Sequence, residues 1–246
     1  MFDYQDKSFT FNHAIWNQNP KSFDLEQPSQ ILPYAVVNDH VKLSFKNTFA
    51  VMDVRTVNHA IKSIILDAQR GIIATSQSAH VLTAALVNTL IYENKRSTSM
   101  ASEQLGYSQT KLPIVQNQYI LSPLGAATRS STSWIGLHSL SDYWADGKRV
   151  KLEFANQVRL IIPKSWLSFE TQVRKARRIQ AELHKMTQQQ LDEAAVNEIV
   201  VPNQALNVPT QVRMYRECTT FVLAQYGIDV CPEDIDFYIH KFFGKL

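Results

Sequence analysis

Alternating apolar and polar residues predict β-strands over most of the first two thirds of the chain. The segments with this pattern are residues 40–45, 47–54, 63–76, 112–121, 133–140 and 148–164. Two of them, 63–76 and 148–164, contain a pair of apolar runs around a short turn, which predicts a β-hairpin in each. The second hairpin should end at Pro163, which cannot donate a ladder hydrogen bond.

Helical spacing replaces the alternation in residues 79–92 and again in the last third of the chain. Ser78 is placed to cap the first helix, and Ser168 to begin a second, long helix. The buried stripe of the long helix is predicted to comprise Phe169, Val173, Ala176, Ile179 or Gln180, Leu183 and Met186. Polar connectors are expected at 93–110 and 187–209, and two further amphipathic helices at about 210–226 and 233–243.

These elements predict an α+β protein with a mostly antiparallel sheet in the first two thirds and amphipathic helices in the last third. Residues 1–38 are polar and mixed, and we expect a loosely ordered N-terminal extension there. Residues 39–186 should form the mixed α+β core. Residues 187–246 should form a linker followed by a helical region.

Composition fits an ordinary globular protein, because 45% of the 246 residues are hydrophobic and 19% are charged. No apolar run approaches the roughly 18 residues that a membrane span needs, and the N-terminus lacks the pattern of a signal peptide. We therefore expect a cytoplasmic protein without a membrane partner.

Charge is distributed unevenly along the chain, although the net charge is only +3. Residues 93–185 contain 14 Lys or Arg against 7 Asp or Glu, whereas residues 186–246 contain 4 against 8. A basic middle region favours a polyanionic partner for that region. Solvated surface charge is the alternative interpretation.

Motifs of the common enzyme classes are missing from the sequence. It contains no GxxxxGK[ST], GxGxxG, GxSxG or HExxH, and it has only 7 glycines. The two cysteines, Cys218 and Cys231, are not part of a metal-ligand cluster, and no histidine pair has HxxxH spacing. We expect no enzymatic activity, no cofactor and no bound metal.

Basic residues gather on the long helix and in turns. Arg174, Lys175, Arg177 and Arg178 fall within five residues of the helix and could contact DNA phosphates, although they could also be its solvated face. Arg129 stands alone in a loop of small residues, from which an arginine could reach into a narrow A/T minor groove. Further basic doublets occur in predicted turns, at Lys95–Arg96 and Lys148–Arg149.

Residues 91–183 resemble the ComK family of bacterial competence transcription factors. The resemblance depends on three blocks: KLPIVQNQYILSPLGAATRSSTSWIGLHSL, FANQVRLIIPKS and SWLSFETQVRKARRIQAEL. The first contains the Ser/Thr-rich loop with Arg129 and Ser131, followed by a strand that begins with Trp134 and Ile135. The third contains the Ser-Phe-Glu-x-Gln-Val start of the long helix. Weaker similarity extends back to about residue 48.

The resemblance implies a homodimeric or larger DNA-binding activator of competence genes, associated with the nucleoid, that recognises A/T-rich duplex boxes through the minor groove. Lys95–Arg96 match the cations of the family's middle loop, and Arg129 and Ser131 match its Thr-Arg loop. The family is also controlled by an adaptor of the Clp protease. Its adaptor-binding element corresponds to residues 205–210, where Val208–Pro209 are kept but the aromatic and lysine residues are missing.

Two alternatives remain at the level of sequence. The protein could bind single-stranded nucleic acid or RNA without sequence preference, with aromatic residues such as Trp134 and Trp166 as stacking platforms. A tryptophan in strand-like surroundings is more often part of the core. The protein could also be a diverged regulator that acts through protein contacts of its acidic C-terminal region.

Overall fold

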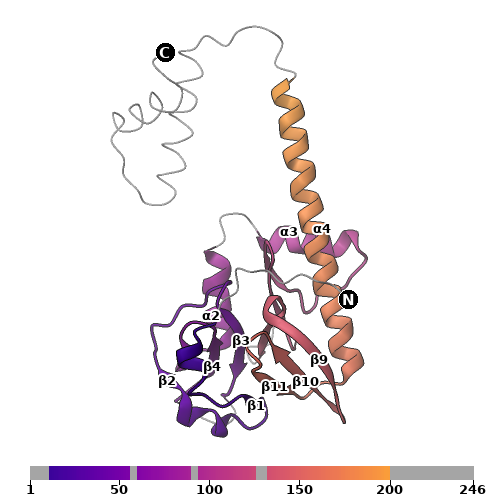
Figure 1. Ribbon diagram of the computed structural model, residues 1–246. Coiled ribbons are helices and arrows are strands. Elements are labelled where there is room, and N and C mark those ends of the chain that lie inside the picture. Colours follow the sequence, from indigo (N-terminus) through magenta and orange to yellow (C-terminus); the bar gives the residue numbers. More distant parts are fainter. Residues whose placement is uncertain (1–10, 56–59, 90–93, 126–131, 200–246) are drawn as a thin grey trace, which may run out of the picture. The chain divides into compact units, whose positions relative to one another are not determined.

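The computed structural model describes residues 11–55, 60–89, 94–125 and 132–199. The chain divides into two compact units, Met1–Gln189 and Gln190–Leu246. The first unit contains two sheets and the start of a long helix, so the predicted α+β class is confirmed (Figure 1).

The larger sheet has seven strands and is antiparallel except at one edge, where β2 pairs with β5 in parallel. In spatial order its strands are β2 (Val36–Val37), β5 (Gly71–Thr75), β4 (Ser63–Asp67), β3 (Thr48–Asp53), β8 (Trp134–Gly136), β7 (Tyr119–Pro123) and β6 (Ile114–Gln116). The central strands β4 and β5 are buried at every position because both faces of the sheet are covered. Ile64 and Leu66 face one hydrophobic core, and Ile65 between them faces the other.

The smaller sheet has four strands in the order β1 (Ser22–Asp24), β11 (Arg159–Ile162), β10 (Arg149–Phe154) and β9 (Leu140–Asp146). The predicted hairpin of residues 148–164 is confirmed as β10 and β11. Val150, Leu152 and Phe154 of β10 are buried in the core that also receives Ile64 and Leu66, whereas the residues between them are partly exposed. The two sheets therefore share one hydrophobic core.

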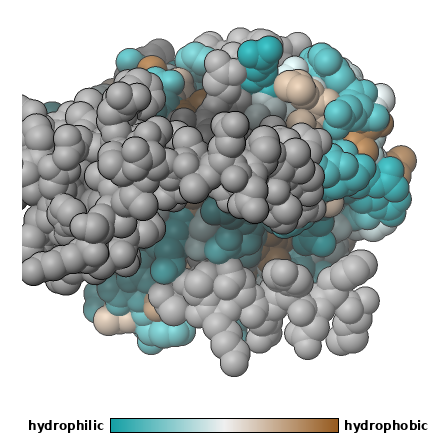
Figure 2. Space-filling view, turned by 90° about the horizontal axis from the view of Figure 1, so that it is seen from above, coloured by the Kyte–Doolittle hydropathy of each residue, from teal (hydrophilic) through white to brown (hydrophobic). Residues whose placement is uncertain are grey.

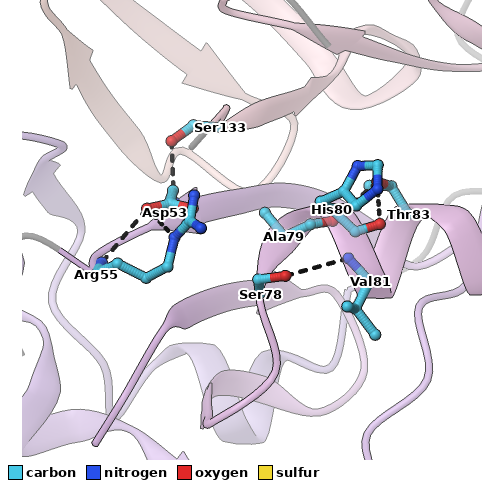
Figure 3. A network of polar contacts seen from close by, with 8 residues as sticks. All are labelled: Asp53, Arg55, Ser78, Ala79, His80, Val81, Thr83 and Ser133. Atoms are coloured by element: carbon cyan, nitrogen blue, oxygen red, sulfur yellow. Dashed lines mark hydrogen bonds and ion pairs between the residues drawn. The ribbon is translucent and has the colours of Figure 1, made fainter. Parts of the chain in front are cut away.

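Four α-helices complete the described fold: α1 (His13–Trp16), α2 (Ala79–Asn88), α3 (Asn94–Gln104) and α4 (Trp166–Ile199). Short 3-10 turns occur at η1 (Pro28–Gln30), η2 (Leu32–Tyr34) and η3 (Leu137–Ser139). Ser78 caps α2 as predicted, since its Oγ accepts from the Val81 amide at 3.3 Å (Figure 3).

The N-terminal half of α4 packs on the core that the two sheets share. Phe169, Val173 and Ala176 of the predicted stripe belong to this core, and Ile179 is fully buried as well. Leu183 and Met186 are only partly buried, and residues 187–189 are exposed. The helix begins at Trp166, two residues before the expected Ser168, because Ser165 accepts from the Ser168 amide at 3.4 Å.

The expectation of a loosely ordered extension is wrong for residues 11–38. Trp16 is 1% exposed, and its indole nitrogen donates to the Asp67 carbonyl at 3.1 Å. Phe23 in β1 and the fully buried Ile31 join the main core. Apolar side chains of this segment are thus part of the main core. Residues 1–10 lie outside the described part.

Several predicted elements differ from the observed ones. Residues 40–45 form no strand; instead Val41, Leu43 and Phe45 cover the core on the α2 side of the larger sheet. The expected single strand at 112–121 is a hairpin of β6 and β7, which turns at Asn117 with a positive φ of 51°. Residues 133–140 divide into β8 and η3.

The two predicted connectors are also partly helical. The polar segment 93–110 contains α3, and α4 continues through Ile199, which lies inside the expected linker at 187–209. The helices expected at 210–226 and 233–243 lie outside the described residues.

Candidate nucleic-acid interface

Helix α4 is fixed against two neighbouring segments by polar contacts from its side chains. The Lys175 ammonium donates to the carbonyls of Ser108 and Thr110 at 2.6 and 2.7 Å, in the segment between α3 and β6. Gln180 Nε2 donates to the Asn117 carbonyl in the β6–β7 turn at 2.7 Å. These contacts determine which side of α4 remains open to solvent.

Tyr107 contacts two of the predicted phosphate-binding residues. Its ring lies 5.9 Å from the Lys175 ammonium, and its hydroxyl is 3.1 Å from Arg178 Nη1. Because the tyrosine is neutral, neither contact compensates the positive charge of Lys175 or Arg178. The predicted cluster on α4 is therefore ordered at its inner edge while Arg177 and Arg178 stay exposed.

Arg174 differs from its neighbours because it pairs with a carboxylate. Its Nε lies 2.6 Å from Glu170 Oε1, one helical turn away. The Tyr143 hydroxyl donates to the other Glu170 oxygen, and this hydrogen bond, followed by that of Arg174, holds the pKa of Glu170 below its usual value. Burial, and then Glu170, raise the pKa of Tyr143 to about 12. Arg174 thus stabilises the packing of α4 on β9.

Two further lysines, Lys111 and Lys164, belong to the same basic region. Burial, and next the charge of Lys111, hold the pKa values of Lys164 and Lys175 below their usual value. Within the described residues, no carboxylate forms an ion pair with any of these three lysines. The structure therefore gathers like charges without neutralising them.

Sequence reasoning missed Lys111 and Lys164, which are 53 positions apart. Each lies close to a proline, in Lys111-Leu112-Pro113 and Pro163-Lys164, at the start or the end of a strand. A lysine at a proline-bounded strand end is a weak signal, and only the packing of α4 against the end of β7 brings the two together.

The Lys148–Arg149 doublet is located elsewhere in the fold. Arg149 Nη1 lies 2.7 Å from Asp24 Oδ2 and joins β10 to β1 at the edge of the smaller sheet. Lys148 is exposed in the β9–β10 turn. No hydrogen bond or ion pair between described residues connects this doublet to α4. Lys148 and Arg149 were predicted to contact DNA, and the ion pair with Asp24 gives Arg149 a structural role.

The other predicted contacts lie at or beyond the edge of the described structure. Arg96 is exposed in the first turn of α3. The backbone of Lys95 belongs to the same helix, but its side chain is outside the described part, as are Arg129 and Ser131. The DNA contacts of Lys95, Arg96, Arg129 and Ser131 stay a prediction.

The two ends of the loop that carries Arg129 are held in the larger sheet. Ser133 Oγ accepts from the Asp53 amide of β3 at 3.0 Å, and Asp53 also pairs with Arg55 at 2.8 Å (Figure 3). The Leu124 amide donates to the Ser133 carbonyl at 2.8 Å, which closes the base of the loop. Leu124 and Ser133, on either side of the segment with Arg129, are therefore fixed next to each other.

The two tryptophans considered as stacking platforms have different surroundings. Trp134 is buried beneath α2 in the second core, whereas Trp166 is 41% exposed at the first residue of α4. In the face shown in Figure 2, the described residues are largely hydrophilic, with scattered hydrophobic ones between them. Such a surface suits polar and charged contacts better than an extended apolar interface.

Other kinds of site receive no support from the described residues. They contain no group of three or more His, Cys, Asp or Glu side chains placed to hold a metal ion. None of their helices combines the length and apolar character needed to cross a bilayer. Burial lowers the pKa of His138 to about 4, so this side chain adds no positive charge near neutral pH.

No protein-family model, no curated protein and no solved structure matches the chain. The function proposed below therefore rests on the arrangement of the residues and on the resemblance within residues 91–183.

Proposed function

We propose that the protein is a DNA-binding transcriptional activator of the ComK type that contacts the phosphate backbone of A/T-rich duplex DNA with one side of α4. The observation that carries this proposal is a set of cations that form no ion pair with a carboxylate of the described residues, although the charge of Arg177 also acts on Glu170. We call it the α4 basic surface, and it consists of Lys111, Lys164, Lys175, Arg177 and Arg178.

Unpaired cations of this kind are suited to phosphate contacts. Lysines that repel each other are destabilised in the free protein, and a polyanion removes that repulsion when it binds. Each phosphate neutralised also releases condensed counterions, so binding should weaken steeply with salt. Carbonyl contacts hold Lys175 in place, which reduces the conformational entropy lost on binding.

Phosphate contacts position a protein on DNA but do not read its sequence. In our proposal the reading is done by the loop that carries Arg129 and Ser131, with Lys95–Arg96 as a second contact. The support is the resemblance to the ComK family together with the fixed ends of that loop at Leu124 and Ser133.

The test is a comparison of duplex binding for two DNA fragments by the purified full-length protein. One fragment carries A/T boxes and the other a G/C-substituted copy, at several salt concentrations. We expect tighter binding to the A/T fragment. Arg129→Ala should weaken A/T binding more than G/C binding, whereas Arg177→Ala should weaken both equally and reduce the salt slope by about 1. Equal wild-type affinities for both fragments would contradict groove-specific reading.

Binding to single strands is the second candidate, because Trp166 is exposed beside the α4 basic surface. Base stacking on one aromatic ring contributes roughly 1–3 kcal/mol. A competition between duplex and single-stranded DNA of equal length distinguishes the two. If the protein prefers the single strand, and Trp166→Ala loses that preference, single-strand binding would be the function instead of duplex binding.

A further inference from the structure

A small pocket lies where the first turn of α4 meets the end of β7. It is a shallow hollow, open to solvent, with about 10 Å³ of room for the centre of a water-sized group, and it is lined by Lys111, Leu124, Lys164, Ser168, Phe169 and Gln172. Phe169 and Leu124 of its lining are buried. The polar residues of the lining are Lys111, Lys164, Ser168 and Gln172, two of which carry a positive charge.

The backbone of Lys111 is held in an unusual conformation at this pocket. Its φ is +55°, in the left-handed region that a lysine rarely adopts. Gln172 Nε2 donates to the Lys111 carbonyl at 2.9 Å and to Ser122 Oγ at 3.2 Å. The fold therefore tolerates local strain and keeps Lys111 at the pocket, a combination that is frequent at functional sites.

The pocket contains only positive and neutral groups from the described residues, and it has no carboxylate in its lining. Burial, and next the charge of Lys111, lower the pKa values of Lys164 and Lys175. The Ser168 and Phe169 amides already donate to Ser165 at 3.4 and 3.0 Å. The attraction for an anion must therefore come from the lysines and the Ser168 hydroxyl.

We propose that this pocket binds a phosphate group, held by the ammonium groups of Lys111 and Lys164 and by the hydroxyl of Ser168. Two positively charged hydrogen-bond donors and one neutral donor suit the oxygens of a tetrahedral anion. The phosphate has two possible sources, a free phosphate and a phosphodiester of bound DNA. In the second case the inference rests on the proposed function.

The first experiment measures free phosphate, by titrating the full-length protein with sodium phosphate against sodium chloride at matched ionic strength and pH 7. We expect phosphate to raise the melting temperature of the wild type. The gain should disappear in Lys164→Gln and in Lys111→Gly. Arg159→Gln, which removes a cation already paired with Glu153 at 2.7 Å, is the control and should keep it.

Lys111→Gly separates binding from folding. Glycine adopts a positive φ without strain, so this variant should melt no lower than the wild type in chloride while its phosphate affinity falls at least tenfold. The proposal is overturned if phosphate does not stabilise the wild type up to 50 mM, roughly fifty times a dissociation constant of about 1 mM. It is also overturned if both lysine variants keep the full effect.

The second experiment measures duplex DNA binding of the same proteins and identifies the source. A five- to tenfold loss in Lys164→Gln and Lys111→Gly assigns the phosphate to DNA, and unchanged DNA affinity with lost phosphate binding assigns a free phosphate. Phosphate binding by a wild type that binds no DNA would reject the proposed function and keep the site. DNA binding that is insensitive to both lysines, without any phosphate effect, would reject the site alone.

Discussion

The β10–β11 hairpin and the N-terminal half of α4 are both rich in basic residues, but the two regions use their cations differently. In the hairpin, Arg149, Lys151 and Arg159 each lie within 3.8 Å of a carboxylate, at 2.7, 3.8 and 2.7 Å. Around α4, Lys111, Lys164 and Lys175 have no carboxylate partner among the described residues. The first set holds strands together, and the second set is available to a ligand.

This difference shows that a count of positive charge does not locate a polyanion site. Basic residues of the two regions look alike in the sequence. They differ only in whether the fold places a carboxylate next to them. The paired cations contribute modestly to stability, as surface ion pairs do. The unpaired lysines oppose folding slightly, which is the arrangement expected where function outweighs stability.

The largest effect on stability should come from replacing Phe169, which lies on α4 and packs in the core that also contains Val150, Leu152 and Phe154 of β10. Phe169 is 2% exposed, its ring centroid lies 5.2 Å from that of Tyr143 on β9, and it lines the pocket at the first turn of α4. Phe169→Ala should lower the free energy of unfolding by about 3–4 kcal/mol, because it leaves a cavity in the core. Urea denaturation of the full chain measures this loss.

Leu167→Ala is the matched control, since Leu167 lies two positions away and is 69% exposed. It should change the unfolding free energy by less than about 0.5 kcal/mol. Equal losses in the two variants would show that α4 is not seated through Phe169.

A smaller effect is expected for Glu170, whose carboxylate pairs with Arg174 and accepts a hydrogen bond from Tyr143 on β9. Glu170→Gln should cost about 1–2 kcal/mol at pH 7, because the ion pair with Arg174 and the charged acceptor for Tyr143 are lost. The folded-state pKa of Glu170 is lowered, so its contribution is complete above the usual value and is lost as the pH falls through the folded-state pKa.

Unfolding free energies of the wild type and Glu170→Gln at pH 7, 5 and 3 check both statements. The difference between the two proteins should be constant from pH 7 to 5 and shrink at pH 3. A difference that does not change with pH would mean that the Glu170 charge adds nothing to the packing of α4.

The smallest effects on stability should sharpen the comparison itself. Arg149→Gln removes a partly exposed ion pair with Asp24 and should cost about 0.5–1 kcal/mol. Lys164→Gln should leave the unfolding free energy unchanged or raise it, because the folded state penalises the charged form of Lys164. Since its pKa is lowered on folding, that penalty is present at neutral pH and disappears as the pH rises past the usual lysine value. A clear loss of stability in Lys164→Gln would mean that its charge has a partner.

Local patterns in the sequence predicted the parts of the fold that depend on local order. The β4–β5 and β10–β11 hairpins, the Ser78 cap and the first buried positions of α4 follow from alternation, capping and helical spacing. Residues 11–38 were misjudged because their apolar side chains show no clear period, yet Trp16 and Ile31 are buried in a core formed largely by distant strands.

The candidate site could be predicted only where its residues are neighbours in sequence. Arg177 and Arg178 were identified from a run of cations on one helix. Lys111 and Lys164 could not be identified because long-range packing brings them together. Conversely, Arg149 and Arg174 looked available for DNA, and their pairing with Asp24 and Glu170 depends on side-chain geometry that no sequence pattern carries.

The most direct test of the α4 basic surface compares two triple variants with the same change in net charge. One replaces Lys111, Lys164 and Lys175 with Gln, and the other replaces Arg149, Lys151 and Arg159 with Gln. The slope of log affinity against log salt for A/T-rich duplex DNA is measured for both and for the wild type. We predict a slope shallower by about 2–3 in the first variant and an unchanged slope in the second. Equal reductions in the two variants would contradict the account, because net charge rather than the α4 basic surface would then govern binding.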